Sequence, residues 1–517
     1  MRPIREGSMN VRLRTIAVLS ACVLVSACGA YVDGDELTAG PTAAGTPVPA
    51  SGDLGEMTTA AEGEALAMPT GAGESLAVPG GGGGAAAGAP ASGEGAAAAG
   101  AAAGATGTQA ASAQREKKND VGVSDTEIKL GVSAPLSGLL GFLGEEVVGA
   151  IDSHMKMVNA KGGIGGRKLK LVAYDDRLDP SLVLANTKRL VEQDKVFAVY
   201  GLFSDAVLEY VNQKKVPMIT FGVTAPPFSS KYPTVFPLIG NAVSWHQEST
   251  FALTNHLGVK PKRVAVLYDT TLFDERGYLP YFKEVWEAVG AEVVSMDPVN
   301  MTDADCSSVA QKVRSLNIDY WDFQGLGWLL CASAMDRLGW KPPMGMGGWT
   351  TSVAGVGAIV GPILTGMLSG NQADQPTGAP RQKSAAHDEY VAAIAKYHPN
   401  LNNFGDLESP ATTGYWVGTK IFVDGITAIA PTITRDELIK WMHGLKDYDV
   451  GIQPPIKSLA PDCKMGSGVS WWARWGWNAE KKEGVRAPES PYVSSPWADK
   501  YGGPCYVTKI ADKIVGG

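Results

Sequence analysis

Short apolar runs alternate with longer amphipathic stretches from residue 127 onward. Residues 128–132 form an apolar run that predicts a strand. Residues 144–160 predict a helix, because Val147 and Ile151 recur at the spacing of one helix face. Further strands are predicted at 169–174, 196–200 and 217–220, and a further helix at 180–194. This alternation predicts a parallel sheet with helices on both faces.

The same alternation restarts near residue 263. Strands are predicted at 263–268, 291–296 and 318–323, and helices at 278–290 and 306–316. Two successive units of this kind predict two lobes. Ligands bind at the carboxyl ends of the strands in open parallel sheets, so two facing lobes predict a cleft for a small molecule. The predicted fold class is α/β, with two Rossmann-like lobes whose parallel sheets surround a ligand cleft.

The N-terminal residues have the pattern of a secretory signal. Arginines precede an apolar stretch at 16–25, which is too short to span a bilayer as a permanent helix. The stretch ends in small residues directly before Cys28, which resembles a bacterial lipobox, and an ordinary signal followed by a chance cysteine is the alternative. Residues 1–27 are interpreted as the signal, with Met1 or Met9 as the start, and Cys28 as the lipidation site.

Residues 28–122 predict a lipidated cysteine followed by a disordered tether. They are rich in Gly and Ala and lack an apolar period with which to build a core. A flexible coil of about 90 residues reaches roughly 50 Å. Loss of residues 1–27 removes four Arg and one Glu, which moves the formal net charge from -8 to -11. This acidic balance argues against nucleic acid as a partner.

Four cysteines lie in the part of the chain that is predicted to fold, and an exported chain favours disulfides. Three pairings are possible. We favour Cys306 with Cys331 and Cys463 with Cys505, because each pair falls within one local region. The cysteines lack CxxC spacing and the six His residues are scattered, so neither a metal nor a cofactor is expected. We also expect no enzyme, since no nucleophile–base pair emerges.

An unusual stretch near the C-terminus reads GVSWWARWGWNAEKKEGVR. Its alternation places several large side chains on one face of a strand. One interpretation is an exposed platform that stacks on a sugar or a partner protein. The other, which we favour because alternation alone explains the pattern, is a hairpin that buries its tryptophans on the second lobe. The alternating residues are Val469, Trp471, Ala473, Trp475 and Trp477.

Four segments resemble the leucine/isoleucine/valine-binding proteins, which are type I periplasmic binding proteins that deliver solutes to ABC importers. These segments read SAPLSGLLGFLGEEVVGA, VNAKGGIGGRKLKLVAYDDRLDP, LVEQDKVFAVYGLFSDA and VPMITFGVTAP. The resemblance runs from about 126 to 430 and is strongest up to 226. It implies a first lobe of residues 123–242 with 372–447, and a second lobe of residues 243–371 with 448–517.

The resemblance also implies a ligand-binding loop after the strand at 217–220. In the family this loop grips the ligand's carboxylate through backbone N–H groups and hydroxyls, and here it corresponds to Gly222, Val223 and Thr224, with Ser204 as the partner serine. Charge-assisted hydrogen bonds suit a desolvated carboxylate. The alternative is a plain strand-to-helix turn with a capping threonine.

The second half departs from the family pattern. The acidic residues that hold a ligand's ammonium are replaced by Gly348 or Trp349 and by the segment 241–243. A buried ammonium without a counter-charge is costly, which favours an aromatic or branched organic acid over an ordinary amino acid as the ligand, and the amino acid stays open as the family's usual ligand. Five residues are candidates for the walls of its pocket: Phe142, Trp245, Phe273, Leu326 and Trp349.

The resemblance therefore implies a solute receptor that is secreted across the cytoplasmic membrane and lipid-anchored on its outer face. Its expected partners are a small carboxylate-containing ligand and the permease subunits of an ABC importer, and the chain is expected to be a monomer. Two alternatives stay open. One is a ligand-sensing lipoprotein that signals to a membrane receptor, and the other is a wall-associated protein that uses the tryptophan face.

Overall fold

The computed structural model describes residues 120–516 with short gaps. These gaps are 139, 203–204, 239–241, 274–276, 301–302, 304, 347–360, 372–383, 404–408, 481–482, 489–492, 496–498 and 501–502. Cys28, Ser204 and Trp349, together with the predicted signal and tether, lie outside the described residues. Within the described part of the chain, no helix has both the length and the apolar character needed to cross a membrane.

The first sheet is fully parallel, as the alternation predicts. Its order is β2-β1-β3-β4-β5, and Leu130 on β1 pairs with Leu171 of β2 on one side and Ala198 of β3 on the other. Its strands are β1 (Glu127–Ala134), β2 (Lys168–Asp175), β3 (Ala198–Gly201), β4 (Met218–Thr220) and β5 (Val235–Pro237). The crossover helices are α1 (Gly141–Ala160), α2 (Pro180–Glu192) and α3 (Leu208–Gln213). Pro180 begins α2, and the Asp179 side chain caps it by accepting from the Ser181 amide.

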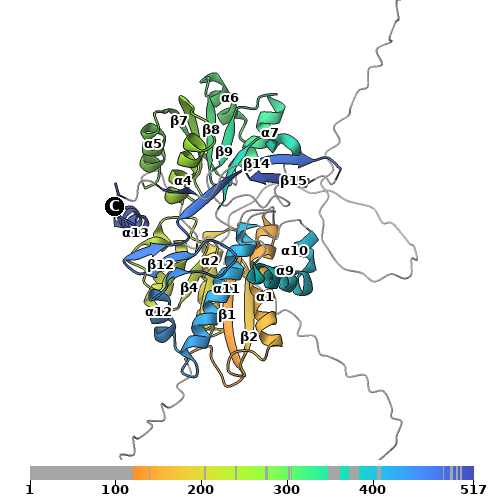
Figure 1. The fold of residues 1–517 in the computed structure, drawn as a ribbon, viewed down its shortest axis with the longest axis vertical. Coiled ribbons are helices and arrows are strands. Elements are labelled where there is room, and N and C mark those ends of the chain that lie inside the picture. The colour runs from red at the N-terminus through yellow and green to blue at the C-terminus, as the bar shows by residue number, and fades with distance from the viewer. Residues whose placement is uncertain are drawn as a thin grey trace, which may run out of the picture. The chain divides into compact units, whose positions relative to one another are not determined.

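Helices from much later in the chain cover one face of this sheet. They are α9 (Ala385–Tyr397), α10 (Pro399–Asn403), α11 (Pro410–Ile429) and α12 (Arg435–His443). Figure 1 shows α9 and α11 packed beside α1. Trp416 of α11 lies fully buried, with its ring 4.5 Å from that of His154 and 5.1 Å from that of Tyr390. The helices that cover the first sheet thus include residues that follow the parallel strands of the second sheet in the sequence.

The second sheet is mixed. Its order is β15-β14-β10-β9-β8-β6-β7, and the strands from β10 to β7 are parallel. Its parallel strands are β6 (Arg263–Asp269), β7 (Glu292–Val299), β8 (Tyr320–Gln324), β9 (Met344–Met346) and β10 (Leu368–Asn371). Its helices are α4 (Ala242–Asn255), α5 (Leu279–Ala288), α6 (Ser307–Ser315) and α7 (Trp328–Arg337), with a short η3 (Gly361–Leu364). Two antiparallel strands, β14 (Val469–Asn478) and β15 (Glu483–Pro488), extend the parallel sheet that the sequence predicts.

The tryptophan-rich stretch is β14, and it is buried on both faces. Trp471 is fully buried and Trp475 is only 2% exposed, while Trp472 on the opposite face is also buried. β14 packs on α4 and also pairs with β16 (Val493–Ser494). The hairpin interpretation is therefore confirmed, and the exposed stacking platform is wrong for Trp471 and Trp475.

Both predicted disulfides are present, as Cys306–Cys331 and Cys463–Cys505. The second joins β13 (Cys463–Met465) to the start of the C-terminal helix α13 (Tyr506–Gly516). β13 belongs to a small antiparallel sheet with β11 (Lys446–Tyr448) and β12 (Ile456–Ala460). This sheet contacts α12 and β5, and α13 contacts η2 (Pro226–Phe228). The lobe limits implied by the resemblance, including the boundary at 447–448, stay a prediction.

Candidate functional site

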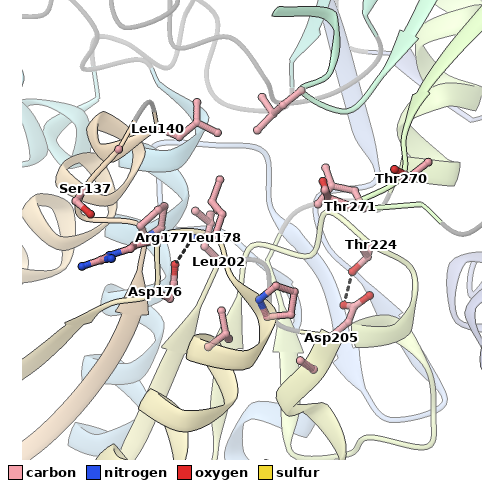
Figure 2. Close-up of a pocket in the computed structure, with 17 residues that line it drawn as sticks. Ser137, Leu140, Asp176, Arg177, Leu178, Leu202, Asp205, Thr224, Thr270 and Thr271 are labelled. Atoms are coloured by element: carbon pink, nitrogen blue, oxygen red, sulfur yellow. Dashed lines mark hydrogen bonds between the residues drawn. The ribbon is translucent and has the colours of Figure 1, made fainter. Parts of the chain in front are cut away.

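A pocket of about 550 Å³ lies where strands of both sheets reach their carboxyl ends (Figure 2). The loops that follow these strands supply residues that line the pocket. In chain order these include Leu140 after β1, Leu178 after β2, Asp205 after β3, Thr224 after β4, Thr271 after β6 and Leu326 after β8. This is the edge at which open parallel sheets bind ligands, because the loops that follow the strands converge there.

The pocket wall is mainly aliphatic. Among the described lining residues there are five leucines and one valine, together with two prolines, and none is aromatic. Leu140, Leu178 and Leu202 come from the first-sheet side, and Leu272 and Leu326 come from the second-sheet side. An apolar wall with a few polar groups is the usual composition of a small-molecule site.

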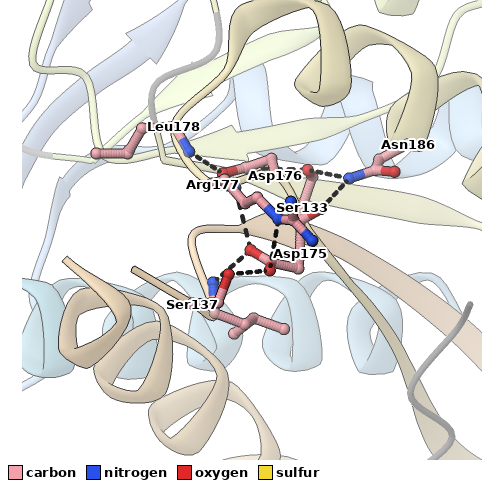
Figure 3. Close-up of polar contacts among 8 residues, drawn as sticks. Ser133, Ser137, Asp175, Asp176, Arg177, Leu178 and Asn186 are labelled. Carbon is pink, nitrogen blue, oxygen red and sulfur yellow. Dashed lines mark hydrogen bonds and ion pairs between the residues drawn. The ribbon is translucent and has the colours of Figure 1, made fainter. Parts of the chain in front are cut away.

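The loop after β2 directs a leucine toward the pocket through an unusual backbone. Arg177 and Leu178 have positive φ angles of 50° and 62°, which non-glycine residues rarely adopt. Asp175 Oδ1 accepts from the Arg177 amide at 3.0 Å, and Asp176 Oδ1 accepts from the Leu178 amide at 3.0 Å (Figure 3). These bonds offset the backbone strain and hold the Leu178 side chain at the pocket, as Figure 2 shows.

The pKa values of Asp175 and Asp176 are shifted in opposite directions. Burial alone would raise the pKa of Asp175, but hydrogen bonds from Ser137 and from backbone amides lower it below its usual value. Asp176 is more deeply buried, and burial raises its pKa to about 6 despite hydrogen bonds from the Leu178 amide and from Ser133 at 2.9 Å. Asp176 is therefore the lining carboxyl of this loop that titrates near neutral pH.

A second carboxyl, Asp205, lies across the pocket at the start of η1 (Asp205–Val207). The Thr224 hydroxyl donates to Asp205 Oδ1 at 2.5 Å, and both residues line the pocket (Figure 2). Asp205 is accessible from the pocket, yet the protein around it desolvates the carboxyl and raises its pKa to about 6, which the bond from Thr224 only partly opposes.

The predicted ligand loop begins with a glycine that cannot be replaced without strain. Gly222 has φ +87°, and a Cβ there would lie 2.9 Å from side-chain atoms of Phe228 and Pro237. Val223 and Thr224 are buried. Within the described residues, the amides of 222–224 have no recorded hydrogen-bond partner. The loop therefore has unpaired donors, as a carboxylate site requires, and its contact with a ligand stays a prediction.

The predicted aromatic residues lie elsewhere. Phe142 is half-buried against the main core. Trp245 on α4 is 2% exposed and packs edge-on against Phe221, with ring centroids 6.3 Å apart. Phe273 is 3% exposed and packs against Tyr278 and Phe282. Thus Thr224 and Leu326 are the predicted residues that the described pocket lining brings together, and none of these placements tests ligand contact.

Several lining residues escaped the sequence reasoning, although a signal for them exists. Asp176 and Thr270 each follow directly after a strand, at the position where loops converge on the pocket. Asp205 is adjacent to the predicted Ser204 and could have been found from that position. Within the described part of the chain, no group of three or more His, Cys, Asp or Glu residues could hold a metal ion.

The reverse side of the ligand loop is tightly packed. The Ala225 amide donates to the Tyr278 hydroxyl at 2.6 Å. Phe228 is fully buried in a cluster that includes Tyr278 and Tyr506. This cluster joins the loop to α5 and α13, so both ends of the chain's second half support the segment that follows the loop.

A buried lysine fixes the next part of the same segment. Lys464 Nζ donates to the carbonyl oxygens of Pro227, Ser229 and Tyr232 at 3.2, 2.9 and 2.6 Å. Burial lowers the pKa of Lys464 to about 7, and the charge of Asp512 partly opposes this shift. All three protons of the ammonium are used by backbone acceptors, so Lys464 has a structural role.

Comparison with known proteins gives a consistent result. Residues 127–475 match the periplasmic binding protein family model. The Leu/Ile/Val-binding protein of Citrobacter freundii is 27% identical over 203 residues, which cover 38% of this chain and 54% of that protein. The Leu/Ile/Val/Thr-binding protein of Salmonella typhimurium is 27% identical over 203 residues, with coverage of 38% and 55%. The chain thus spans about half the length of the curated relatives it matches.

Solved structures show the same fold. A fatty acid ABC transporter substrate-binding protein from Thermomonospora curvata has a TM-score of 0.62 at 22% identity, covering 75% of this chain and 98% of that one. A branched chain amino acid ABC transporter from Thermus thermophilus with bound valine has a TM-score of 0.61 at 14% identity, covering 76% and 100%. A type 1 periplasmic binding protein from Bordetella pertussis scores 0.60 at 19% identity, covering 70% and 100%. The predicted fold class is confirmed, and these relatives and neighbours are binding proteins and not enzymes.

Proposed function

Because this chain belongs to the periplasmic binding protein family, as its resemblance to the leucine/isoleucine/valine-binding proteins predicts, we propose that it is the solute-binding component of an ABC importer. The observation that carries the proposal is the pocket formed by loops from both sheets, with Thr224 on one side and Leu326 on the other. Closure of the two sides around a ligand shifts an open–closed equilibrium, and the permease subunits would bind the closed form.

The proposed ligand is a small carboxylate-containing molecule with an aliphatic body. Thr224 lines the pocket and belongs to the loop whose amides at 222–224 have no recorded partner in the described chain, which supports a carboxylate at that end. The leucines of the wall support an aliphatic body over an aromatic one. The pocket volume of about 550 Å³ equals that of about 18 water molecules at ~30 Å³ each. It therefore accommodates an amino acid together with ordered water, or a longer aliphatic chain.

Family membership places the protein outside the cytoplasm. We further propose that Cys28 carries a lipid and that the following tether holds a monomeric receptor at the outer face of the cytoplasmic membrane. The signal-like pattern of residues 1–27 supports export by this route.

A thermal-shift screen of the purified protein against aliphatic amino acids, aliphatic acids and aromatic acids tests the proposal. A ligand that binds only the folded state adds about 2.7 kcal/mol of stability at a hundredfold excess over its Kd. We expect an aliphatic ligand to raise the Tm, and Leu326→Trp, which places a larger side chain in the pocket wall, to abolish the shift. Val121→Trp, at an exposed position, is the matched control. A shift that survives Leu326→Trp would place the ligand elsewhere and contradict the proposal.

A further inference from the structure

We propose that Asp205 binds a protonated amino group of the ligand, so that an amine is recognised from the first-sheet side of the pocket. This inference rests on the proposed function, since it requires a ligand in this pocket. Asp205 lies in the first half of the chain, where the family resemblance implies only groups that bind the ligand's carboxylate. The proposal therefore gives the ligand's amino group a partner in that half.

The two oxygens of Asp205 are in different situations. Oδ1 accepts the proton of the Thr224 hydroxyl at 2.5 Å. Oδ2 has no recorded partner within the described residues, and the carboxyl is accessible from the pocket (Figure 2). An ionised carboxylate is an acceptor with several lone pairs, so Oδ2 can accept a hydrogen bond from a bound ligand.

The hydroxyl groups that line the pocket leave no proton for a ligand. Thr224 donates to Asp205, Ser137 donates to Asp175 Oδ2 at 2.5 Å, and Thr271 donates to Asp269 Oδ1 at 2.5 Å. Thr270 donates to the Val299 carbonyl at 3.3 Å. A hydroxyl has one proton and two lone pairs, so each of these groups presents only acceptor capacity to the pocket. Polar ligand groups that meet these side chains must therefore be donors.

The charges around the pocket favour a cation. The described lining residues contain two carboxyls, Asp176 and Asp205, and one guanidinium, Arg177. Arg177 is largely exposed, and its Nε lies 3.6 Å from Asp175 Oδ2. Figure 2 shows its guanidinium directed away from the leucines of the wall. No other Lys or Arg is among the described lining residues, so the described part of the pocket offers Asp205 Oδ2 no protein cation besides Arg177.

The proposed amine site is compatible with a carboxylate on the same ligand. Thr224 belongs to the loop with unpaired amides and also bonds Asp205, so the two sites adjoin. An α-amino acid carries its amino and carboxylate groups on one carbon atom. Such a ligand contacts Asp205 and the loop amides together, and the buried ammonium gains the counter-charge that it needs.

Titration calorimetry of the full mature protein at pH 7.5 with three probes tests the inference without any variant. The probes are l-leucine, 4-methylpentanoate, which lacks the amino group, and 3-methylbutylamine, which lacks the carboxylate. We expect leucine to bind at least tenfold more tightly than 4-methylpentanoate, and the amine to bind measurably. Equal affinity for leucine and 4-methylpentanoate would overturn the inference and leave the proposed function standing. Absence of binding by all three probes would overturn the inference together with the proposed aliphatic ligand.

The variant Asp205→Asn, which keeps the size of the side chain and removes its charge, locates the effect. We expect leucine and 3-methylbutylamine to lose at least tenfold in affinity while 4-methylpentanoate loses none. Asp388→Asn removes an equal charge from an exposed position on α9 and is the matched control. A melting curve of each variant establishes that it is folded. Equal losses for 4-methylpentanoate and leucine in Asp205→Asn would contradict an amine-specific role.

Discussion

The two sides of segment 222–232 each hold a desolvated ionisable group, and the two groups are satisfied to different degrees. Lys464, behind the segment, donates to three carbonyl oxygens. Asp205, on the pocket side, accepts from Thr224 and has one oxygen without a recorded partner in the described chain. A group whose hydrogen-bonding capacity is fully used by the backbone holds a local structure in place, whereas a half-bonded carboxylate beside a cavity is available to a ligand. Lys464 therefore stabilises the segment, whereas Asp205 is the group that we propose binds the ligand.

The largest effect is expected from the packed side. Phe228→Ala removes a fully buried ring from the cluster behind the ligand loop and should lower the free energy of unfolding by about 3–5 kcal/mol. Leu178→Ala, on the pocket side, should cost roughly 1 kcal/mol, because that side chain is half-buried and faces a cavity. Urea unfolding of both variants measures the difference, and equal losses would remove the distinction between the two sides.

The buried lysine predicts a pH dependence of stability. With a pKa of about 7 in the folded state, Lys464 binds fewer protons than in the unfolded chain between pH 7 and its ordinary pKa, so stability should rise with pH in that window. The contribution between pH 7 and 9.5 is of order 3 kcal/mol. Lys464→Met should remove this slope, as measured by urea unfolding at the two pH values.

Two ionisable neighbours of Lys464 bear on that experiment. Asp512 faces Lys464 from α13 and raises the pKa of the lysine, while burial lowers the pKa of His443 so that it stays neutral across this window. A slope that is the same in Lys464→Met and the parent protein would show that another group carries it.

On the pocket side, the pH dependence should be in binding. Asp205 has a pKa of about 6, so only about one-tenth of it is ionised at pH 5, and the affinity for 3-methylbutylamine should fall about tenfold between pH 7.5 and 5. Asp176, which also lines the pocket, has a pKa of about 6 as well. Calorimetry with Asp205→Asn separates the two carboxyls. If the affinity of Asp205→Asn for 3-methylbutylamine still falls tenfold between pH 7.5 and 5, protonation of Asp176 causes the change.

The smallest effect concerns the bond between the two pocket residues. Thr224→Val removes the donor to Asp205 and should cost about 1 kcal/mol of unfolding free energy. It should also raise the pKa of Asp205 further, since that hydrogen bond favours the ionised form. Thr224→Ser retains the hydroxyl and should behave like the parent protein. If Thr224→Ser lost more unfolding free energy than Thr224→Val, packing of the threonine methyl group would contribute more than the hydrogen bond to Asp205.

Much of the fold could be predicted because apolar spacing reports element type directly. The predicted strand at 128–132 lies within β1, and the predicted helix at 144–160 lies within α1. The order of the strands within each sheet was harder to predict, because apolar spacing does not identify the neighbours of a strand. β14 was predicted as a strand, but its antiparallel place beside β10 depends on contacts between distant residues.

The site was predicted in part for a related reason. The loop at 222–224 was identified through its resemblance, and Thr224 does line the pocket. The predicted wall residues Trp245 and Phe273 lie in packed aromatic clusters and not among the described lining residues, and their contact with a ligand stays a prediction. Asp205 was missed because periodicity does not report where a side chain points within a short 3₁₀ turn.

The order of the elements along the chain has a consequence for biosynthesis. The last strand of the first sheet, β5, is complete at Pro237, yet its covering helices α9 and α11 are made only after the parallel strands of the second sheet. Until then, His154 and its apolar neighbours on α1 lack the ring of Trp416. A nascent chain therefore exposes an uncovered apolar helix face from the completion of α1 at Ala160 until α11 begins at Pro410. Any truncation before α11 should yield an aggregation-prone fragment.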